Sequence, residues 1–149
     1  MQRINLGKVA PELYKTVLEL ENLSMQKVQQ AGLEIGFSHL LKLRASQINQ
    51  CAFCVRMQTQ DAMKAGESME RIALISAWQE SGYFSEKERA ALILIEEITL
   101  IAQQHFPDSA YQKATKILSD AEIAAIEWIA IVINTWNRIA ISSQYAVNP

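Results

Sequence analysis

The spacing of apolar residues is the feature that most limits how this chain can fold. Along the 149 residues, apolar side chains recur at intervals of three and four, and only five glycines and three prolines interrupt them. Such intervals match one face of an α-helix, whereas a half-buried strand needs an interval of two. Half of the residues are apolar and a fifth are charged, which suits one soluble domain with a real core. The pattern predicts an all-α fold, a compact multi-helix bundle, as a single domain over residues 1–149.

Capping signals and chain breakers divide the sequence into eight predicted helices. Two serine-x-x-glutamate capping boxes, Ser85–Glu88 and Ser119–Glu122, mark the starts of two of them. Pro11 suits the first turn of the first helix, and Asp108 is expected to cap the seventh. The predicted helices span residues 11–20, 23–30, 36–45, 49–64, 68–79, 85–104, 107–118 and 119–142.

Charge and hydropathy exclude several classes of partner. The net charge of −2 and the isoelectric point of about 5.7 argue against a surface for nucleic acid or anionic membrane. The longest apolar run, 123–133, is interrupted by Glu127 and is too short to span a bilayer. Residues 1–10 contain no apolar segment of signal-peptide length. We therefore expect a cytoplasmic protein with no nucleic-acid or membrane partner.

Cys51 and Cys54 are the only cysteines, and they form a Cys-x-x-Cys motif near the start of a predicted helix. Thiols three residues apart on a helix share one face and lie within reach of a disulfide. A dithiol/disulfide cycle is one interpretation, and a pair of small buried hydrophobic residues is the other. A purely structural disulfide is disfavoured because so short a loop constrains little of the unfolded chain. A closed zinc site needs four ligands, and only His39 and His105 are available as nitrogen donors.

A working cysteine must be a thiolate, so its pKa has to be lowered by its surroundings. The predicted helix start around Asn49 offers free N–H groups and the positive end of the helix dipole to Cys51 and, less strongly, to Cys54. Arg44 and Arg56 are nearby cations in the sequence. They either favour the thiolate or belong to a solvated helix face.

The segment 43–54, together with Asp61-Ala62 and residues 66–68, resembles the alkyl hydroperoxidase D and carboxymuconolactone decarboxylase family. It is most similar to the small AhpD-like members that carry the Cys-x-x-Cys motif. Residues 77–78, 85–91 and 134–138 also look like that subgroup, so the resemblance covers nearly the whole chain. It implies an all-helical, cofactor-free protein that forms homo-oligomers, commonly trimers or hexamers.

The resemblance also implies roles for the two cysteines. Cys54 would be the nucleophile whose thiolate attacks a peroxide O–O bond, and Cys51 would condense with the resulting sulfenic acid to form the disulfide. An external dithiol, a lipoyl group or a thioredoxin-like protein, would then reduce the pair.

The chain departs from the family pattern at both positions of its proton relay. The family motif reads CxxCxxxH, with a glutamate twelve residues before the first cysteine. Here the histidine position is Gln58 and the glutamate position is His39. Glutamine cannot act as a general base, but it can orient a water or a substrate oxygen. His39 either serves as the base from the opposite side of the site or is a remnant of a lost relay.

These observations together predict a thiol-dependent peroxidase that reduces small organic hydroperoxides, with Cys54, Cys51, His39 and Gln58 as its site residues. One alternative is a protein dithiol–disulfide oxidoreductase in which the pair exchanges with another protein's disulfide. Another is a catalytically silent oligomeric binding module that has kept the fold. Lactone decarboxylation is more distant, because the family members that perform it generally lack the cysteine pair.

Overall fold

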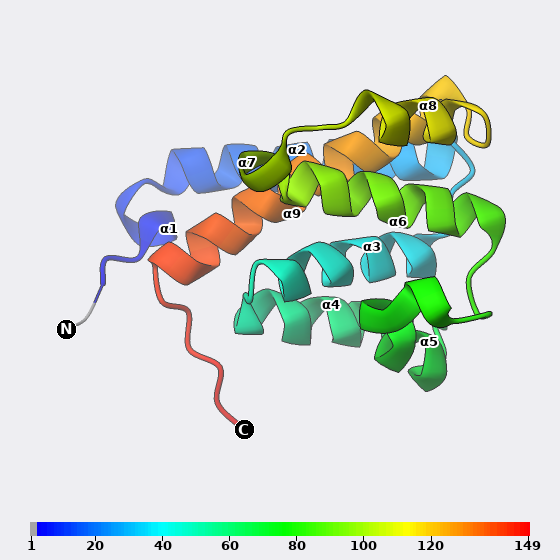
Figure 1. The fold of residues 1–149 in the computed structure, drawn as a ribbon. Coiled ribbons are helices and arrows are strands. Elements are labelled where there is room, and N and C mark those ends of the chain that lie inside the picture. The colour runs from blue at the N-terminus through cyan, green and yellow to red at the C-terminus, as the bar shows by residue number, and fades with distance from the viewer. Residues whose placement is uncertain (1–2) are drawn as a thin grey trace.

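The computed structural model describes residues 3–149. Within that range nine α-helices and one 3-10 helix follow one another through short connections, and there is no strand (Figure 1). The prediction of an all-α chain is therefore confirmed. The helices are α1 (Leu6–Val9), α2 (Pro11–Gln30), α3 (Ile35–Ile48), α4 (Ala52–Lys64), α5 (Met69–Leu74), η1 (Ile75–Glu80), α6 (Glu86–Thr99), α7 (Ile101–Gln104), α8 (Asp108–Thr115) and α9 (Asp120–Ser142).

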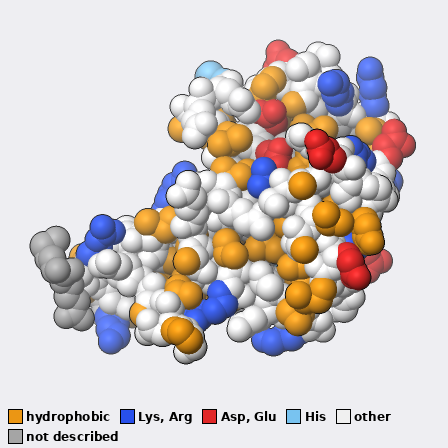
Figure 2. All heavy atoms as spheres, turned by 60° about the horizontal axis from the view of Figure 1, so that its bottom comes forward, with side chains coloured by type: hydrophobic (Ala, Val, Ile, Leu, Met, Phe, Trp, Pro, Cys, Tyr) orange, Lys and Arg blue, Asp and Glu red, His pale blue; other side chains and the backbone are white. Residues whose placement is uncertain are grey.

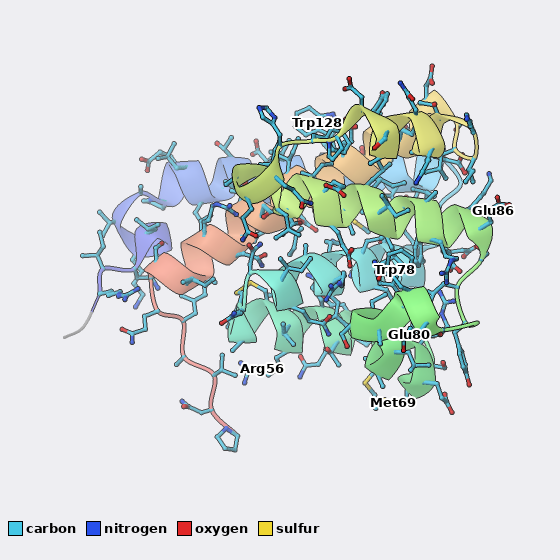
Figure 3. The ribbon with its side chains drawn as sticks, viewed as in Figure 1. Arg56, Met69, Trp78, Glu80, Glu86 and Trp128 are labelled. Atoms are coloured by element: carbon cyan, nitrogen blue, oxygen red, sulfur yellow. A yellow bond between two sulfur atoms is a disulfide. The ribbon has the colours of Figure 1, made fainter. Side chains whose placement is uncertain are left out.

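Helix α3 lies at the centre of the bundle, where it packs against α4, α6 and α9 (Figure 1). The long helix α9 also contacts α2 and α6, so these elements enclose one continuous core. Trp78 of η1 closes the core beside α6 (Figure 3), and its indole N–H donates to Glu96 at 2.9 Å. Most of the largest fully buried apolar side chains come from α3, α6 and α9, and Ile75 of η1 and Val28 of α2 complete the set. Those of the three helices are Leu40, Leu41, Leu43, Leu92, Leu94, Ile95, Ile126, Ile129 and Ile133.

Both predicted capping boxes are present. The Ser85 hydroxyl accepts from the backbone N–H of Glu88, and the Ser119 hydroxyl accepts from that of Glu122. Each glutamate carboxylate in turn accepts from the backbone N–H of its serine. Burial alone would raise the pKa of Glu122, but hydrogen bonds from Lys87 and Ser119 lower it below its ordinary value. The Glu122 carboxylate therefore ties the start of α9 to α6 through Lys87.

Several predicted boundaries are wrong. The predicted helices 11–20 and 23–30 form the single helix α2, because no glycine or proline interrupts the chain between them. The predicted helix 68–79 changes into 3-10 geometry from Ile75, with a non-helical backbone at Ala77. The predicted helix 85–104 breaks at Leu100 into α6 and α7. Asp108 lies in the first turn of α8 and does not cap it, since Pro107 occupies the N-cap position.

The surface carries no broad region of one charge on the face in Figure 2, where cationic and anionic side chains are interspersed with hydrophobic ones. Large apolar side chains are exposed on α2 and α9, including Leu13 at 65%, Leu23 at 58% and Trp128 at 47%. Among the helices of residues 3–149, none combines the length and the apolar character that crossing a membrane requires.

Candidate active site

The turn between α3 and α4 fixes the position of the two cysteines. Helix α3 ends at Ile48, and Gln50 adopts a left-handed backbone with φ of 55°. Cys51 is extended and is the N-cap of α4, with its sulfur accepting from the Cys54 N–H at 3.4 Å. The predicted helix start at Asn49 is therefore three residues early, because a left-handed residue such as Gln50 cannot lie inside a right-handed helix.

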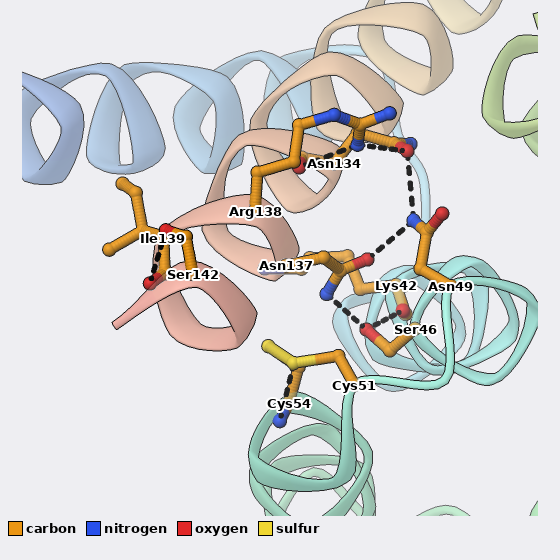
Figure 4. Close-up of a disulfide and its surroundings, with 10 residues drawn as sticks. All are labelled: Lys42, Ser46, Asn49, Cys51, Cys54, Asn134, Asn137, Arg138, Ile139 and Ser142. Atoms are coloured by element: carbon orange, nitrogen blue, oxygen red, sulfur yellow. Dashed lines mark hydrogen bonds between the residues drawn. A yellow bond between two sulfur atoms is a disulfide. The ribbon is translucent and has the colours of Figure 1, made fainter. Parts of the chain in front are cut away.

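Cys51 and Cys54 are joined by a disulfide, with their Cα atoms 5.3 Å apart (Figure 4). Both residues are buried, at 1% and 4% exposed, in a small cluster with Ala140, Phe53 and Tyr145. Cys54 lies in the first turn of α4, where the helix dipole and free N–H groups stabilise negative charge. In the reduced protein this location favours the thiolate of Cys54.

A cavity of about 260 Å³ lies between α2, α3, α4 and α9, and through it a small molecule can reach Cys54. Cys54 is part of its wall, whereas Cys51 is not among the described residues that line it. The wall is mainly apolar on one side and polar around His39 on the other. The lining residues are Tyr14, Leu18, Glu21, His39, Lys42, Phe53, Cys54, Met57, Gln58, Asp61, Ile133, Trp136, Ala140 and Tyr145.

His39 and Gln58 meet on this wall, one from α3 and the other from α4. His39 Nδ1 is 2.9 Å from Gln58 Oε1. Because an amide oxygen only accepts hydrogen bonds, Nδ1 carries the proton and Nε2 keeps its lone pair. Burial lowers the pKa of His39 below its ordinary value, and the nearby charge of Lys42 lowers it further. The imidazole is therefore neutral at pH 7, with Nε2 able to accept a proton.

Three charged residues that the sequence analysis did not assign to the site, Glu21, Lys42 and Asp61, also line the cavity. Lys42 is only 2% exposed, and its Nζ is 2.6 Å from Glu21 Oε1. The other carboxylate oxygen of Glu21 accepts from the indole N–H of Trp136 at 3.1 Å. A lysine inside the apolar run of residues 40–43 was the available signal for Lys42. Glu21 gave no comparable signal, because it was placed between two predicted helices.

The two arginines considered as activating cations serve other purposes. Arg44 forms an ion pair with Glu96 at 2.6 Å, which links α3 to α6. Arg56 lies on the exposed side of α4 (Figure 3) and donates to the backbone carbonyl of Asn148 at 3.0 Å. The helix start therefore remains as the predicted source of thiolate stabilisation.

A buried chain of polar side chains supports the cysteine turn from the side of α9 (Figure 4). Asn137, which is fully buried, accepts from Asn49 at 2.8 Å and donates to Ser46 Oγ at 3.0 Å. Asn49 also donates to Asn134 at 2.9 Å. The Cys51 N–H in turn donates to the carbonyl oxygen of Ser46 at 3.0 Å. The network therefore connects α9 to the turn that carries the disulfide.

Metal binding finds no support in the geometry. Within residues 3–149, no three His, Cys, Asp or Glu side chains are grouped so that they could hold a metal ion. His105 is exposed at the end of α7, whereas His39 lines the cavity.

Comparison with known proteins shows which family shares this arrangement. The model of the carboxymuconolactone decarboxylase family matches residues 11–97, which include α2, α3, the cysteine turn and α4. The chain is 37% identical to the uncharacterized protein YdfG of Bacillus subtilis (strain 168), over 95% of this chain and 93% of the relative.

A solved structure is similar over the full length. It is that of a protein of unknown function from Agrobacterium tumefaciens, described as a candidate AhpD antioxidant defence protein. It is 43% identical, has a TM-score of 0.88, and the match covers 100% of this chain and 99% of the other. The chain therefore belongs to the carboxymuconolactone decarboxylase family and is AhpD-like.

Proposed function

We propose that this protein is a thiol-dependent peroxidase that reduces small organic hydroperoxides through a Cys54/Cys51 cycle. One observation carries the proposal: Cys54 lines a small cavity beside the neutral imidazole of His39 while it is disulfide-bonded to Cys51 at the start of α4. A nucleophile and a base thus line one space, and the second thiol is bonded to the nucleophile from behind the cavity wall. The similarity to a candidate antioxidant defence protein supports the same function.

The cycle begins with the reduced pair. Nε2 of His39 takes the proton of the Cys54 thiol, and the thiolate attacks the terminal oxygen of the hydroperoxide. The O–O bond breaks, the sulfur becomes a sulfenic acid, and the leaving alkoxide takes the proton from His39 to give the alcohol. The Cys51 thiol then displaces water from the sulfenic acid and restores the disulfide. The net reaction converts one hydroperoxide and two thiols into one alcohol, one water and one disulfide.

The cavity restricts the size of the substrate. Pockets for drug-sized ligands measure about 300–1,000 Å³, and this one holds about 260 Å³. Its apolar side, formed by residues such as Leu18, Ile133 and Trp136, suits a short alkyl or aryl group. Gln58 holds the Nδ1 proton of His39, so it orients the base and does not itself move a proton.

An external dithiol is needed to complete each turnover, and a lipoyl group or a thioredoxin-like protein fits that requirement. Both cysteines are buried and Cys54 lines the cavity, so we expect the reductant to attack the Cys54 sulfur through the cavity. We also propose that the chain forms a homo-oligomer, a trimer or hexamer, because Leu13, Leu23 and Trp128 leave apolar surface exposed on the described chain. Light scattering after size-exclusion chromatography measures the subunit count, and a monomer at micromolar concentration would contradict this part.

The central test compares wild-type protein with Cys54→Ser and Cys51→Ser, using dithiothreitol as reductant and cumene hydroperoxide as substrate. Cys54→Ser should consume no more hydroperoxide than buffer with reductant. After dithiothreitol has been removed, Cys51→Ser treated with cumene hydroperoxide should accumulate a sulfenic acid on Cys54, detectable by dimedone labelling and mass spectrometry.

Wild-type turnover no faster than that of Cys54→Ser would refute the peroxidase function. If the wild-type pair then exchanged with a protein disulfide faster than both serine variants, the dithiol–disulfide oxidoreductase would replace it. If neither reaction depended on the cysteines, the chain would be a silent binding module.

A further inference from the structure

Lys42 is the buried charged group in the cavity wall that the cycle described above does not use. It lies on α3, three residues after His39, and only 2% of its side chain is exposed. Both residues line the cavity that contains Cys54. The charge of Lys42 is close enough to lower the pKa of His39. A cation therefore lines the same cavity as Cys54.

The hydrogen bonds of Lys42 leave one N–H of its ammonium group without a partner among the described residues. An ammonium group has three N–H donors. One points to Glu21 Oε1 at 2.6 Å, and a second points to the weak acceptor Met25 Sδ at 3.3 Å. The third N–H has no partner among the described residues.

The buried ion pair is poorly explained by stability alone. Lys42 is 2% exposed and Glu21 is 21% exposed. Removing charges from water is costly, and the attraction between the two ions often does no more than offset that cost. Glu21 is held by two donors, Lys42 on one oxygen and Trp136 on the other. Through these two bonds Glu21 fixes the ammonium group against the cavity.

We propose that Lys42 is a further catalytic residue, which donates its free N–H to the leaving oxygen of a hydroperoxide held against Cys54. This inference rests on the proposed peroxidase function. Negative charge moves from the Cys54 sulfur to the leaving oxygen as the O–O bond breaks, and a fixed cation in a water-poor cavity stabilises that charge. Glu21 and Trp136 are positioning residues, since they act only through Lys42.

Lys42 and His39 have different roles in this step, and together they keep its atoms and charges balanced. Lys42 keeps all three protons throughout, and its hydrogen bond to the leaving oxygen forms as the alkoxide develops. The proton that converts the alkoxide into the alcohol is the one that His39 removed from Cys54. The electrons come from the sulfur, which is oxidised to sulfenic acid while the peroxide oxygen is reduced.

The test uses Lys42→Met with a series of peroxides that differ in the basicity of the leaving group. Loss of one such donor lowers the rate by about 10²–10³-fold, and we expect that loss in kcat/KM for tert-butyl hydroperoxide, which releases a strongly basic alkoxide. Peracetic acid releases acetate, a much weaker base that needs less stabilisation, so its loss should be smaller by about tenfold or more. The exposed Lys64→Met, at 76% exposed, is the matched control and should match wild type with both peroxides.

A second variant protects the test against a folding defect. Lys42→Met alone leaves Glu21 as a buried unpaired charge, whereas Glu21→Gln with Lys42→Met removes both charges and keeps an acceptor for Trp136. The double variant should unfold at a denaturant midpoint close to wild type and still show the leaving-group dependence.

Each outcome then has a clear meaning. Equal losses for the two peroxides, or no loss in the double variant, would refute the role of Lys42 while wild-type activity upholds the peroxidase. Wild-type protein that consumes neither peroxide faster than Cys54→Ser would refute both proposals.

Discussion

Replacement of Asn137 by alanine should destabilise the protein strongly although no charge and little apolar surface are lost. Asn137 is fully buried between α9 and the cysteine turn. Its side chain accepts one hydrogen bond from Asn49 and donates one to Ser46. Alanine would remove both bonds and leave a polar space that no other side chain of the network fills.

The magnitude follows from what each partner loses. One N–H of Asn49 would lose its acceptor, since the other already bonds to Asn134. An unsatisfied buried donor costs about 1–3 kcal/mol, and because Asn49 is half-buried its loss lies in the lower half of that range, about 1–2 kcal/mol. Ser46 keeps its own bond to the Lys42 carbonyl and loses only an ordinary hydrogen bond, worth about 0.5–1.5 kcal/mol. The sum is about 1.5–3.5 kcal/mol, which corresponds to a fall in Tm of about 3–14 °C for a chain of this size.

Urea unfolding of the oxidised protein, followed by circular dichroism, measures this change. Ser142→Ala is the matched control, because Ser142 is exposed on the same helix and bonds to the Ile139 carbonyl, outside the network; it should change the free energy of unfolding by less than about 0.5 kcal/mol. A loss below about 1 kcal/mol in Asn137→Ala, or one equal to that of Ser142→Ala, would show that the network does not hold the cysteine turn.

Three further predictions concern pH and access. Because burial holds the pKa of His39 below its ordinary value, kcat/KM for a hydroperoxide should fall only below about pH 6.5. His39→Asn should remove this acidic fall in the pH profile and slow turnover by about 10²–10⁴-fold. A fall centred above about pH 6.5 would contradict the assignment of His39 as the base. Glu122→Gln should cost about 1–2 kcal/mol at pH 7 in urea unfolding. The lowered pKa of Glu122 makes this contribution present above about pH 4.3 and lost as the pH falls further, so an unchanged difference at pH 3 would refute it. Tyr145→Ala removes a ring that packs edge-to-face on Phe53 at 5.1 Å and lines the cavity; iodoacetamide should then alkylate reduced Cys54 several-fold faster, and an unchanged rate would show that Tyr145 does not limit access.

Local signals in the sequence were sufficient for much of the helical framework. The capping boxes at Ser85 and Ser119 placed two helix starts correctly, because capping involves residues only three positions apart. The breaks at Ala77 and Leu100 were missed. Neither position contains glycine or proline, so nothing local marks an interruption that tertiary packing imposes.

The candidate site, like the helices, was predicted from the sequence only where its signals are local. Cys51 and Cys54 were found because their spacing is local, and His39 and Gln58 because both could be located by their distance along the chain from the cysteines. Their hydrogen bond and the common cavity depend on how α3 packs against α4. The Lys42 contact with Glu21 crosses from α3 to α2, and such a contact between distant segments has no periodic signature.

The sequence by itself determined the helical class, the cysteine pair and the family, because each depends on residue type at short, fixed spacing. Only the tertiary structure decided that Cys54 faces the cavity, that His39 presents Nε2 as its free acceptor, and that a buried cation is held nearby. These properties depend on burial and on the relative placement of whole helices. Burial sets the energy of a charge, and helix packing sets which groups can meet, so His39 could be chosen as the proposed proton acceptor only from the three-dimensional structure.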